Sequence, residues 1–255
     1  MHILVTNDDS VTAPGLLVLS QELRKSHQVT ILAPDRNWSA SGHVKTMHRP
    51  LRVREALLDD GSHALASDGA PSDCVALAML GLIEDEIDIV VSGINPHANI
   101  GHDVTYSGTV TAAMEAAIWG IPGIAVSLDS PENHPGDLEY GPAARVAGKV
   151  VNMVIKQNMN SKTVLNVNVP YGDEDAFNGY QITRQGLRVY RDRLDRRVDP
   201  RGQAYYWIGG DSPTGVPAEG TDFSSLANGY VSITPLHLDL TANKMLETLQ
   251  GWEWN

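Results

Sequence analysis

Short apolar runs alternate with longer amphipathic segments over roughly the first two thirds of the chain. This alternation is typical of a parallel sheet covered by helices. The apolar runs predict strands over residues 2–6, 28–33, 87–92, 123–128 and 163–169. Helical spacing predicts a helix that begins at Pro14 and further helices over residues 72–83, 109–119 and 143–157. We therefore expect an α/β fold with a mostly parallel sheet.

The character of the chain changes after Pro170. Residues 180–210 are rich in charged and aromatic side chains and contain few helix signals, so we expect β-hairpins or an extended arm there. A strand over residues 230–234 and a closing helix over 241–249 complete the predicted elements. At 255 residues the chain is long enough for one large domain, or for one domain that carries a sizeable insertion.

Charge narrows the classes of ligand. The chain has 19 basic and 31 acidic residues, which gives a formal net charge of −12. Such a field repels nucleic-acid backbones and anionic membranes, so neither is an expected partner. If the substrate is a phosphate, a bound cation is the obvious source of attraction. The single cysteine, Cys74, excludes an internal disulfide and suits a reducing compartment.

No membrane segment is expected. The opening MHILVTNDD lacks a basic leader, and the apolar stretch over residues 118–128 is interrupted by Gly120, Pro122 and Gly123. We therefore expect a cytoplasmic protein.

Polar residues gather where the predicted parallel strands end. Asp8 and Asp9 follow the first strand, and the next loops contribute hydroxyl and amide side chains, Ser39 and Asn95 among them. Because ligands bind beyond the carboxyl ends of parallel strands, these loops form the expected binding edge. An all-oxygen set of this kind prefers magnesium, manganese or calcium. The alternative is that the Asp pair caps a helix N-terminus.

Tyr106-Ser107-Gly108-Thr109 leads directly into the predicted 109–119 helix. Backbone N–H groups at a helix start, together with the hydroxyls of Ser107 and Thr109, can hold a phosphate without net charge. A plain Ser or Thr N-cap is the simpler interpretation. We favour the phosphate site because the acidic pair is expected at the same edge of the sheet.

Taken together, HILVTNDD, APDRNWSASG, SGINPHANIGHDVTYSGTV, LNVNVP and TDFSSLANGYVSITPL resemble the SurE family of stationary-phase survival proteins. Members of that family are metal-dependent phosphatases of nucleoside monophosphates. The likeness covers nearly the whole chain. The combination of NDD, SGIN and YSGTV at these spacings is highly specific.

The resemblance implies a Rossmann-like catalytic part with helices on both faces of its sheet, over residues 1–170. Residues 171–255 are then a β-rich oligomerisation arm and a C-terminal strand and helix within the same structural unit. It also implies one divalent metal ion, Mg²⁺ or Mn²⁺, and a homodimer or homotetramer built through the 180–210 arm. By the same match, Asp8, Asp9, Ser39 and Asn95 are the metal ligands, and Ser107, Gly108 and Thr109 belong to the phosphate pocket.

Two positions depart from the family pattern: Ser10 and His97 stand where glycine is usual. Neither is a matched ligand, although both could alter the shape of a site loop. The expected reaction is in-line attack of water on a nucleoside monophosphate, with Asp8 or Asp9 polarising the water. A nucleotide-binding regulatory module without turnover, or a phosphatase of short polyphosphate, are the alternatives.

Overall fold

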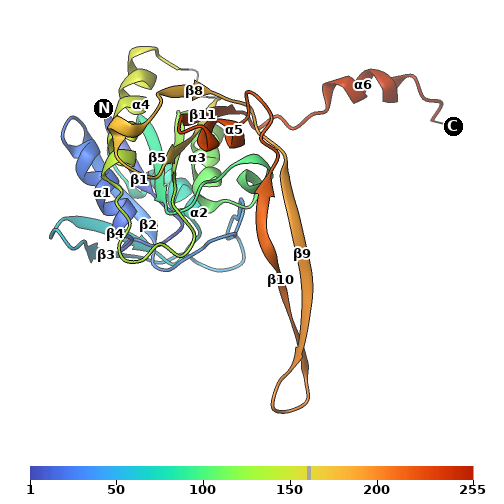
Figure 1. Cartoon of the computed structure of the whole chain (residues 1–255). Coiled ribbons are helices and arrows are strands. Elements are labelled where there is room, and N and C mark those ends of the chain that lie inside the picture. The colour runs from blue at the N-terminus through green and yellow to red at the C-terminus, as the bar shows by residue number, and fades with distance from the viewer. Residues whose placement is uncertain (160–161, 255) are drawn as a thin grey trace.

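A computed structural model describes residues 1–159 and 162–254 (Figure 1). Its centre is a nine-stranded sheet with the order β3-β4-β2-β1-β5-β6-β7-β11-β8. The six strands from β4 to β7 in that order run parallel, whereas β3 and β11 are antiparallel to their neighbours β4 and β7. The strands are β1 (His2–Thr6), β2 (Gln28–Pro34), β3 (Val53–Leu57), β4 (His63–Ser67), β5 (Ile89–Asn95), β6 (Gly123–Asp129), β7 (Val164–Pro170), β8 (Tyr180–Ile182) and β11 (Val231–Leu236).

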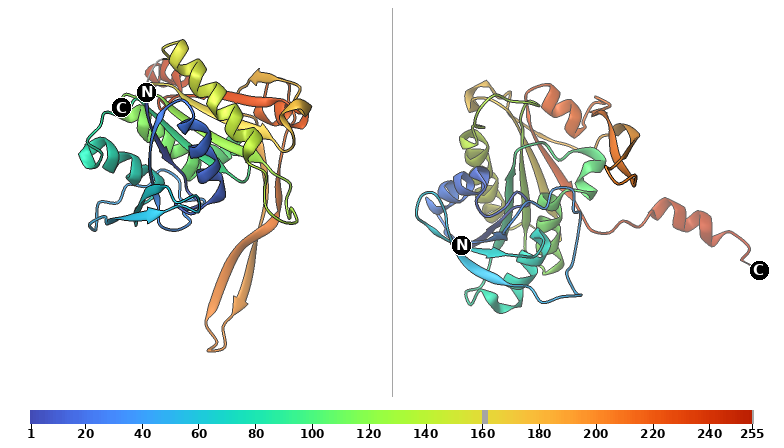
Figure 2. Two further views of the ribbon diagram at one scale, coloured as in Figure 1. Left: turned by 90° about the vertical axis from the view of Figure 1, so that its left-hand side faces the viewer. Right: turned by 90° about the horizontal axis from the view of Figure 1, so that it is seen from below.

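Helices cover both faces of this sheet (Figure 2). Side chains alternate between the faces of a strand, so β1 directs Ile3 and Val5 to one core and Leu4 to the other. The first core is closed by α1 (Pro14–Arg24) and α4 (Gly141–Lys156), and the second by α2 (Pro71–Leu77) and α3 (Gly108–Ile118). The remaining helical elements are the π-turn η1 (Ala78–Leu82), the 3-10 turns η2 (Gly101–Thr105) and η3 (Glu174–Ala176), α5 (Asp222–Ala227) and α6 (Asn243–Gln250).

The predicted α/β architecture with a mostly parallel, helix-covered sheet is confirmed, and most predicted elements lie within two residues of the observed ones. The 72–83 helix was predicted too long. It ends at Leu77 and continues as the π-turn, in which Gly81 adopts a positive φ of 102°. The 87–92 strand was placed too early, since β5 extends to Asn95. The strands β3 and β4 and the helix α5 were not predicted.

The 180–210 region forms a short strand, β8, followed by a long hairpin. Strands β9 (Arg188–Val198) and β10 (Ala204–Gly215) pair antiparallel and extend well away from the sheet (Figures 1 and 2). The predicted closing helix exists as α6, but it contains no buried residue and lies away from the body of the molecule (Figure 1). In the described part of the chain, no helix is long and apolar enough to cross a membrane.

The strand order reverses direction at β1. From β1 the chain proceeds to β2 on one side, and it later returns to β5 on the other side. Ligands of open parallel sheets bind at such a switch point, outside the carboxyl ends of the two strands. The residues that follow β1 and end β5 therefore define the place to look for a site.

Candidate functional site

Asp8 lies directly after β1 and is buried against the start of α3. Its Oδ1 accepts a hydrogen bond from the Thr109 hydroxyl at 2.5 Å. Burial raises the pKa of Asp8, although the Thr109 hydroxyl and the backbone N–H groups of Thr109 and Gly108 oppose that shift. The approach is close enough to require glycine at position 108, where a Cβ atom would lie 2.7 Å from Asp8 Cβ. The Asp8 carboxylate thus lies against the first turn of α3, in contact with Thr109.

Asp9 has a different environment. Its Oδ2 is buried and has no hydrogen-bond partner. Burial and the neighbouring Asp8 carboxylate raise the pKa of Asp9 to about 7. A second negative charge beside Asp8 is costly unless a cation lies nearby. The acidic pair thus combines one carboxylate that is satisfied by the helix with one that is not.

The two other predicted ligands come from segments that meet this pair. The backbone N–H of Trp38 donates to the Asp8 carbonyl at 2.7 Å, and the exposed Ser39 is the next residue after Trp38. Asn95 is the half-buried last residue of β5, the strand that pairs with β1. Its Nδ2 donates to the His97 carbonyl, which leaves Oδ1 as a free acceptor.

The donor chemistry of these four residues fits a divalent cation. Two carboxylates, a hydroxyl and an amide oxygen form a hard, all-oxygen set, and the unpartnered Asp9 Oδ2 supplies the atom that a cation would satisfy. Among the described residues, no group of three or more His, Cys, Asp or Glu side chains is arranged to hold a metal. A donor set made only of oxygen atoms suits hard divalent cations.

Ser107 occupies the N-cap position of α3. Its Oγ accepts a hydrogen bond from the Val110 N–H at 3.1 Å, so the simpler N-cap interpretation is correct for this residue. A hydroxyl that accepts one bond still has its own hydrogen to donate. The capping role and a phosphate-binding role are therefore compatible for Ser107. The Thr109 hydroxyl, in contrast, is already committed to Asp8.

Two functional candidates were missed by sequence reasoning. Tyr140 precedes α4 and is buried; burial, together with the nearby charge of Asp9, raises its pKa to about 12. Glu115 is buried within α3 and binds side chains from the loop that carries Ser39. A glutamate in the otherwise apolar run over residues 112–118 was the available signal for this second residue.

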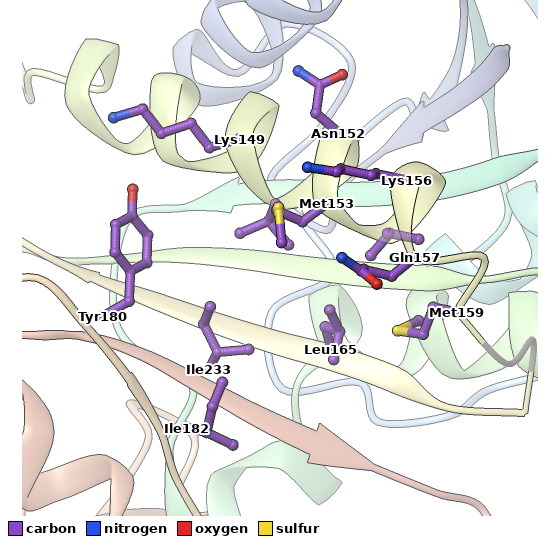
Figure 3. Close-up of a pocket in the computed structure, with 12 residues that line it drawn as sticks. Lys149, Asn152, Met153, Lys156, Gln157, Met159, Leu165, Tyr180, Ile182 and Ile233 are labelled. Carbon is purple, nitrogen blue, oxygen red and sulfur yellow. The ribbon is translucent and has the colours of Figure 1, made fainter.

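A large groove elsewhere on the molecule is unrelated to this edge of the sheet. It has a volume of about 730 Å³ and lies between α4 and the strands β7, β11 and β8 (Figure 3). Leu165, Ile182 and Ile233 are among its lining residues, and its wall is mainly apolar. None of the predicted metal or phosphate residues lines it. Size alone therefore does not identify the site.

The two departures from the family pattern have different structural settings. Ser10 has a φ of 119°, a conformation that side chains other than hydrogen rarely adopt, which explains why glycine suits this position. Its hydroxyl shares a hydrogen bond with Thr12 at 3.0 Å. His97 is exposed, and its Nδ1 lies 3.2 Å from the Ser130 Oγ, within hydrogen-bond distance.

The fold and this edge define the class: a Rossmann-like α/β protein with an acidic site at the switch point of its sheet. Comparison with known proteins then identifies the family. The family model "Survival protein SurE" matches residues 3–192. The 5'-nucleotidase SurE of Herpetosiphon aurantiacus is 49% identical over 100% of this chain and 99% of its own length. That of Chloroflexus aggregans is 48% identical over the whole of both chains.

Solved structures agree with this assignment. The crystal structure of the SurE protein from Aquifex aeolicus superposes with a TM-score of 0.81 at 38% identity, covering 98% of each chain. The chain belongs to the SurE family.

The buried, unpartnered Asp9 carboxylate should cost stability when no metal is present. The pKa of the Asp9 carboxyl rises from 3.8 in the unfolded chain to about 7 in the folded protein. Between these two pH values the unfolded chain loses the proton more readily, so the folded state becomes less stable as the pH rises. In chelator at pH 8, Asp9→Asn should therefore be more stable than the wild type, by on the order of 4 kcal/mol. Urea unfolding at pH 8 and pH 4.5 measures this. The difference should shrink at the lower pH, and a mutant less stable than the wild type at pH 8 would contradict the burial argument.

The strained backbone at Ser10 gives a second prediction. Ser10→Gly should stabilise the protein by about 1 kcal/mol, because relief of the positive φ outweighs the flexibility that glycine adds to the unfolded chain. Ser10→Ala is the matched control, since it keeps the strain and removes only the hydroxyl contact with Thr12. Thermal unfolding of both variants checks the sign; equal melting temperatures for them would show that the strain is unimportant.

Proposed function

We propose that this protein hydrolyses nucleoside monophosphates to nucleoside and phosphate with the help of one divalent metal ion, Mg²⁺ or Mn²⁺. Its class follows from family membership: the chain is a 5'-nucleotidase of the SurE family. The observation that supports the metal-dependent mechanism is the buried Asp9 oxygen that has no partner, beside an Asp8 that is bonded to Thr109.

In this proposal Asp8, Asp9, Ser39 and Asn95 hold the ion. When bound, the ion supplies positive charge that offsets the phosphate and orients it for displacement. Thr109 fixes the Asp8 carboxylate through its hydroxyl, and Gly108 permits the close approach that this bond requires. The ligand set is thus oriented by the same helix that faces the phosphate.

Ser107, Gly108 and Thr109 form the proposed phosphate pocket. The Ser107 hydroxyl has a hydrogen left to donate, and the N-terminal end of α3 carries partial positive charge. Thr109 contributes indirectly, because its hydroxyl holds Asp8. A terminal phosphate with free oxygens fits such contacts, whereas an internal phosphodiester does not.

We assign water as the nucleophile, and one carboxylate of the acidic pair, Asp8 or Asp9, polarises it and accepts its proton. The water oxygen forms a bond to phosphorus while the ester P–O bond breaks in line, and the leaving oxygen takes a proton from solvent. A covalent phospho-aspartate is less favoured, because a metal-bound carboxylate is a poor nucleophile.

A regulatory module that binds nucleotides without turnover remains the second candidate. The acidic pair argues against it, because a protein that only binds an anion gains nothing from an additional buried carboxylate such as Asp9. A phosphatase of short polyphosphate would use the same metal and phosphate residues. Assays with polyphosphate and with nucleoside monophosphates distinguish it from the proposed enzyme. The single cysteine, Cys74, is free and buried, which suits the reducing cytoplasm in which we propose that the enzyme works.

A panel of phosphate esters tests the proposed reaction. We expect phosphate release from several 5'- and 3'-nucleoside monophosphates, with modest preference among bases. Activity on triphosphates should be low, because the sequence has no G-x-x-x-x-G-K-S/T loop, whose lysine would hold a triphosphate tail. Chelation should abolish release, and magnesium or manganese should restore it. Asp9→Asn should lower turnover by at least a hundredfold and weaken the metal affinity measured by calorimetry. Full activity in chelator, or activity confined to triphosphates, would refute the proposal.

The β9–β10 hairpin, within the 180–210 arm, is the proposed contact for a homodimer or homotetramer. Tyr206, Trp207 and Ile208 on β10 are 56%, 61% and 85% exposed, and Leu194 opposite Ile208 is 66% exposed. An isolated two-stranded hairpin is marginally stable in water, and exposed aromatics of this density are typical of subunit contacts. In this proposal residues 1–170 carry the chemistry, and residues 171–255 complete the same unit and carry the arm.

Shortening the arm should reduce the mass of the assembly. Arg191 and Asp211 are register partners, so the hairpin beyond them can be replaced by a two-residue turn without separating the strands. We expect a smaller species in light scattering, with the circular dichroism of the sheet and helices retained. An unchanged mass would exclude the arm as the subunit contact.

A further inference from the structure

The segment over residues 38–46, here called the strap, crosses the first turns of α3 and connects the acidic pair to that helix. At its start the Trp38 N–H donates to the Asp8 carbonyl at 2.7 Å. In its middle the Gly42 N–H donates to the Tyr106 carbonyl at 2.9 Å, and the Gly42 carbonyl accepts from the Thr111 hydroxyl at 3.1 Å. Ser39 lies between these two fixed points.

One buried carboxylate on α3, that of Glu115, binds side chains of the strap. The Glu115 side chain is 2% exposed. Its oxygens accept hydrogen bonds from His43 Nε2 at 2.8 Å and from Lys45 Nζ at 3.0 Å. The indole N–H of Trp119 donates a third bond at 3.0 Å. Burial alone would raise the pKa of Glu115, but these three donors outweigh it and lower the pKa to about 2.

The strap has two further contacts beside the partners of Glu115: Lys45 Nζ lies 5.9 Å from the centre of the Trp119 ring, and the Ser72 hydroxyl donates to the Val44 carbonyl. The side chains of His43 and Lys45 are 31% and 50% exposed, and they belong to a loop without regular secondary structure. The end of the strap has a second anchor, because Asp73 accepts bonds from the N–H and hydroxyl of Thr46 at 2.8 and 2.6 Å. Between Gly42 and Thr46, Glu115 accepts hydrogen bonds from two strap side chains, His43 and Lys45.

We infer that Glu115 is a positioning residue for the metal site, holding the strap so that Ser39 stays beside Asp8 and Asp9. This inference rests on the proposed function, because it takes Ser39 as a metal ligand. A buried glutamate that only stabilised α3 would have no need to bind two side chains from the loop that carries Ser39. A hydrogen bond to an ionised carboxylate is stronger than one between neutral groups, so removing the charge of Glu115 should weaken its bonds to the strap.

The test measures metal binding directly and therefore does not depend on turnover. Glu115→Gln keeps the shape of the side chain and removes the charge that His43 and Lys45 bind. Calorimetric titration with Mn²⁺ should show a dissociation constant about tenfold higher than that of the wild type. Glu174→Gln is the matched control, because Glu174 also binds two cationic side chains, Arg145 and Lys149, but on η3 and α4. It should bind Mn²⁺ as the wild type does.

A double mutant separates positioning from a general loss of stability. If Glu115 acts through Ser39, Glu115→Gln should weaken binding in the wild-type background and have almost no further effect in the Ser39→Ala background. Additive losses, or unchanged affinity in Glu115→Gln, would overturn the inference. If Glu115→Gln does not fold by circular dichroism, Lys45→Met gives the same test from the strap side and should likewise lose its effect in Ser39→Ala.

The outcomes also separate this inference from the proposed function. A wild-type protein that binds no divalent ion would overturn both. A wild type that binds Mn²⁺ and loses binding in Asp9→Asn, while Glu115→Gln binds normally, would overturn only the role of Glu115.

Discussion

The contact between the Asp8 carboxylate and the first turn of α3 is the interaction on which the rest of the site depends. Hydrogen bonds from the Thr109 hydroxyl and from helix N–H groups make it possible to bury one acidic side chain at the end of β1. Asp9 then follows with no helix to satisfy it, and its pKa rises to about 7 through burial and repulsion by Asp8. The Asp8 carboxylate is thus stabilised by its contact with α3, whereas the Asp9 carboxylate is costly to ionise. A divalent cation beside Asp9 would remove that cost.

Close backbone approaches keep the elements of this edge together. A Cβ atom at Gly108 would collide with Asp8, and one at Gly15 near the start of α1 would lie 2.3 Å from the Ile94 carbonyl. Glycine at these two positions therefore allows α3 and α1 to approach the ends of β1 and β5. These two glycines are therefore required by packing, and a larger residue at Gly15 or Gly108 would disturb the site although neither position is a proposed metal ligand.

The elements that could be predicted from the sequence are those whose buried positions form a regular apolar pattern. Strand β1 is buried along its whole length, and its boundaries were predicted to the residue. The β3–β4 hairpin was missed because β3 has no fully buried residue and carries Arg54 and Glu55, so its pattern resembles that of a loop. The position of Asp8 and Asp9 followed from the rule for parallel sheets. Their division into bonded and free carboxylates, and the bonds of Glu115, depend on contacts between residues far apart in the sequence, which no local pattern contains.

Charge explains why a metal-dependent site suits this protein. The chain carries a net charge of −12, and His43 and Lys45 of the strap are bound to Glu115. The groups proposed to bind the phosphate are the Ser107 hydroxyl and the N-terminus of α3, neither of which carries a full positive charge. Two adjacent carboxylates would repel a phosphate dianion more strongly than those groups attract it. A divalent ion held by the acidic pair would reverse the sign of that interaction, and the same ion would remove the cost of burying Asp9. One cation would thus meet two needs of this edge of the sheet, the attraction of an anionic substrate and the neutralisation of a buried carboxylate.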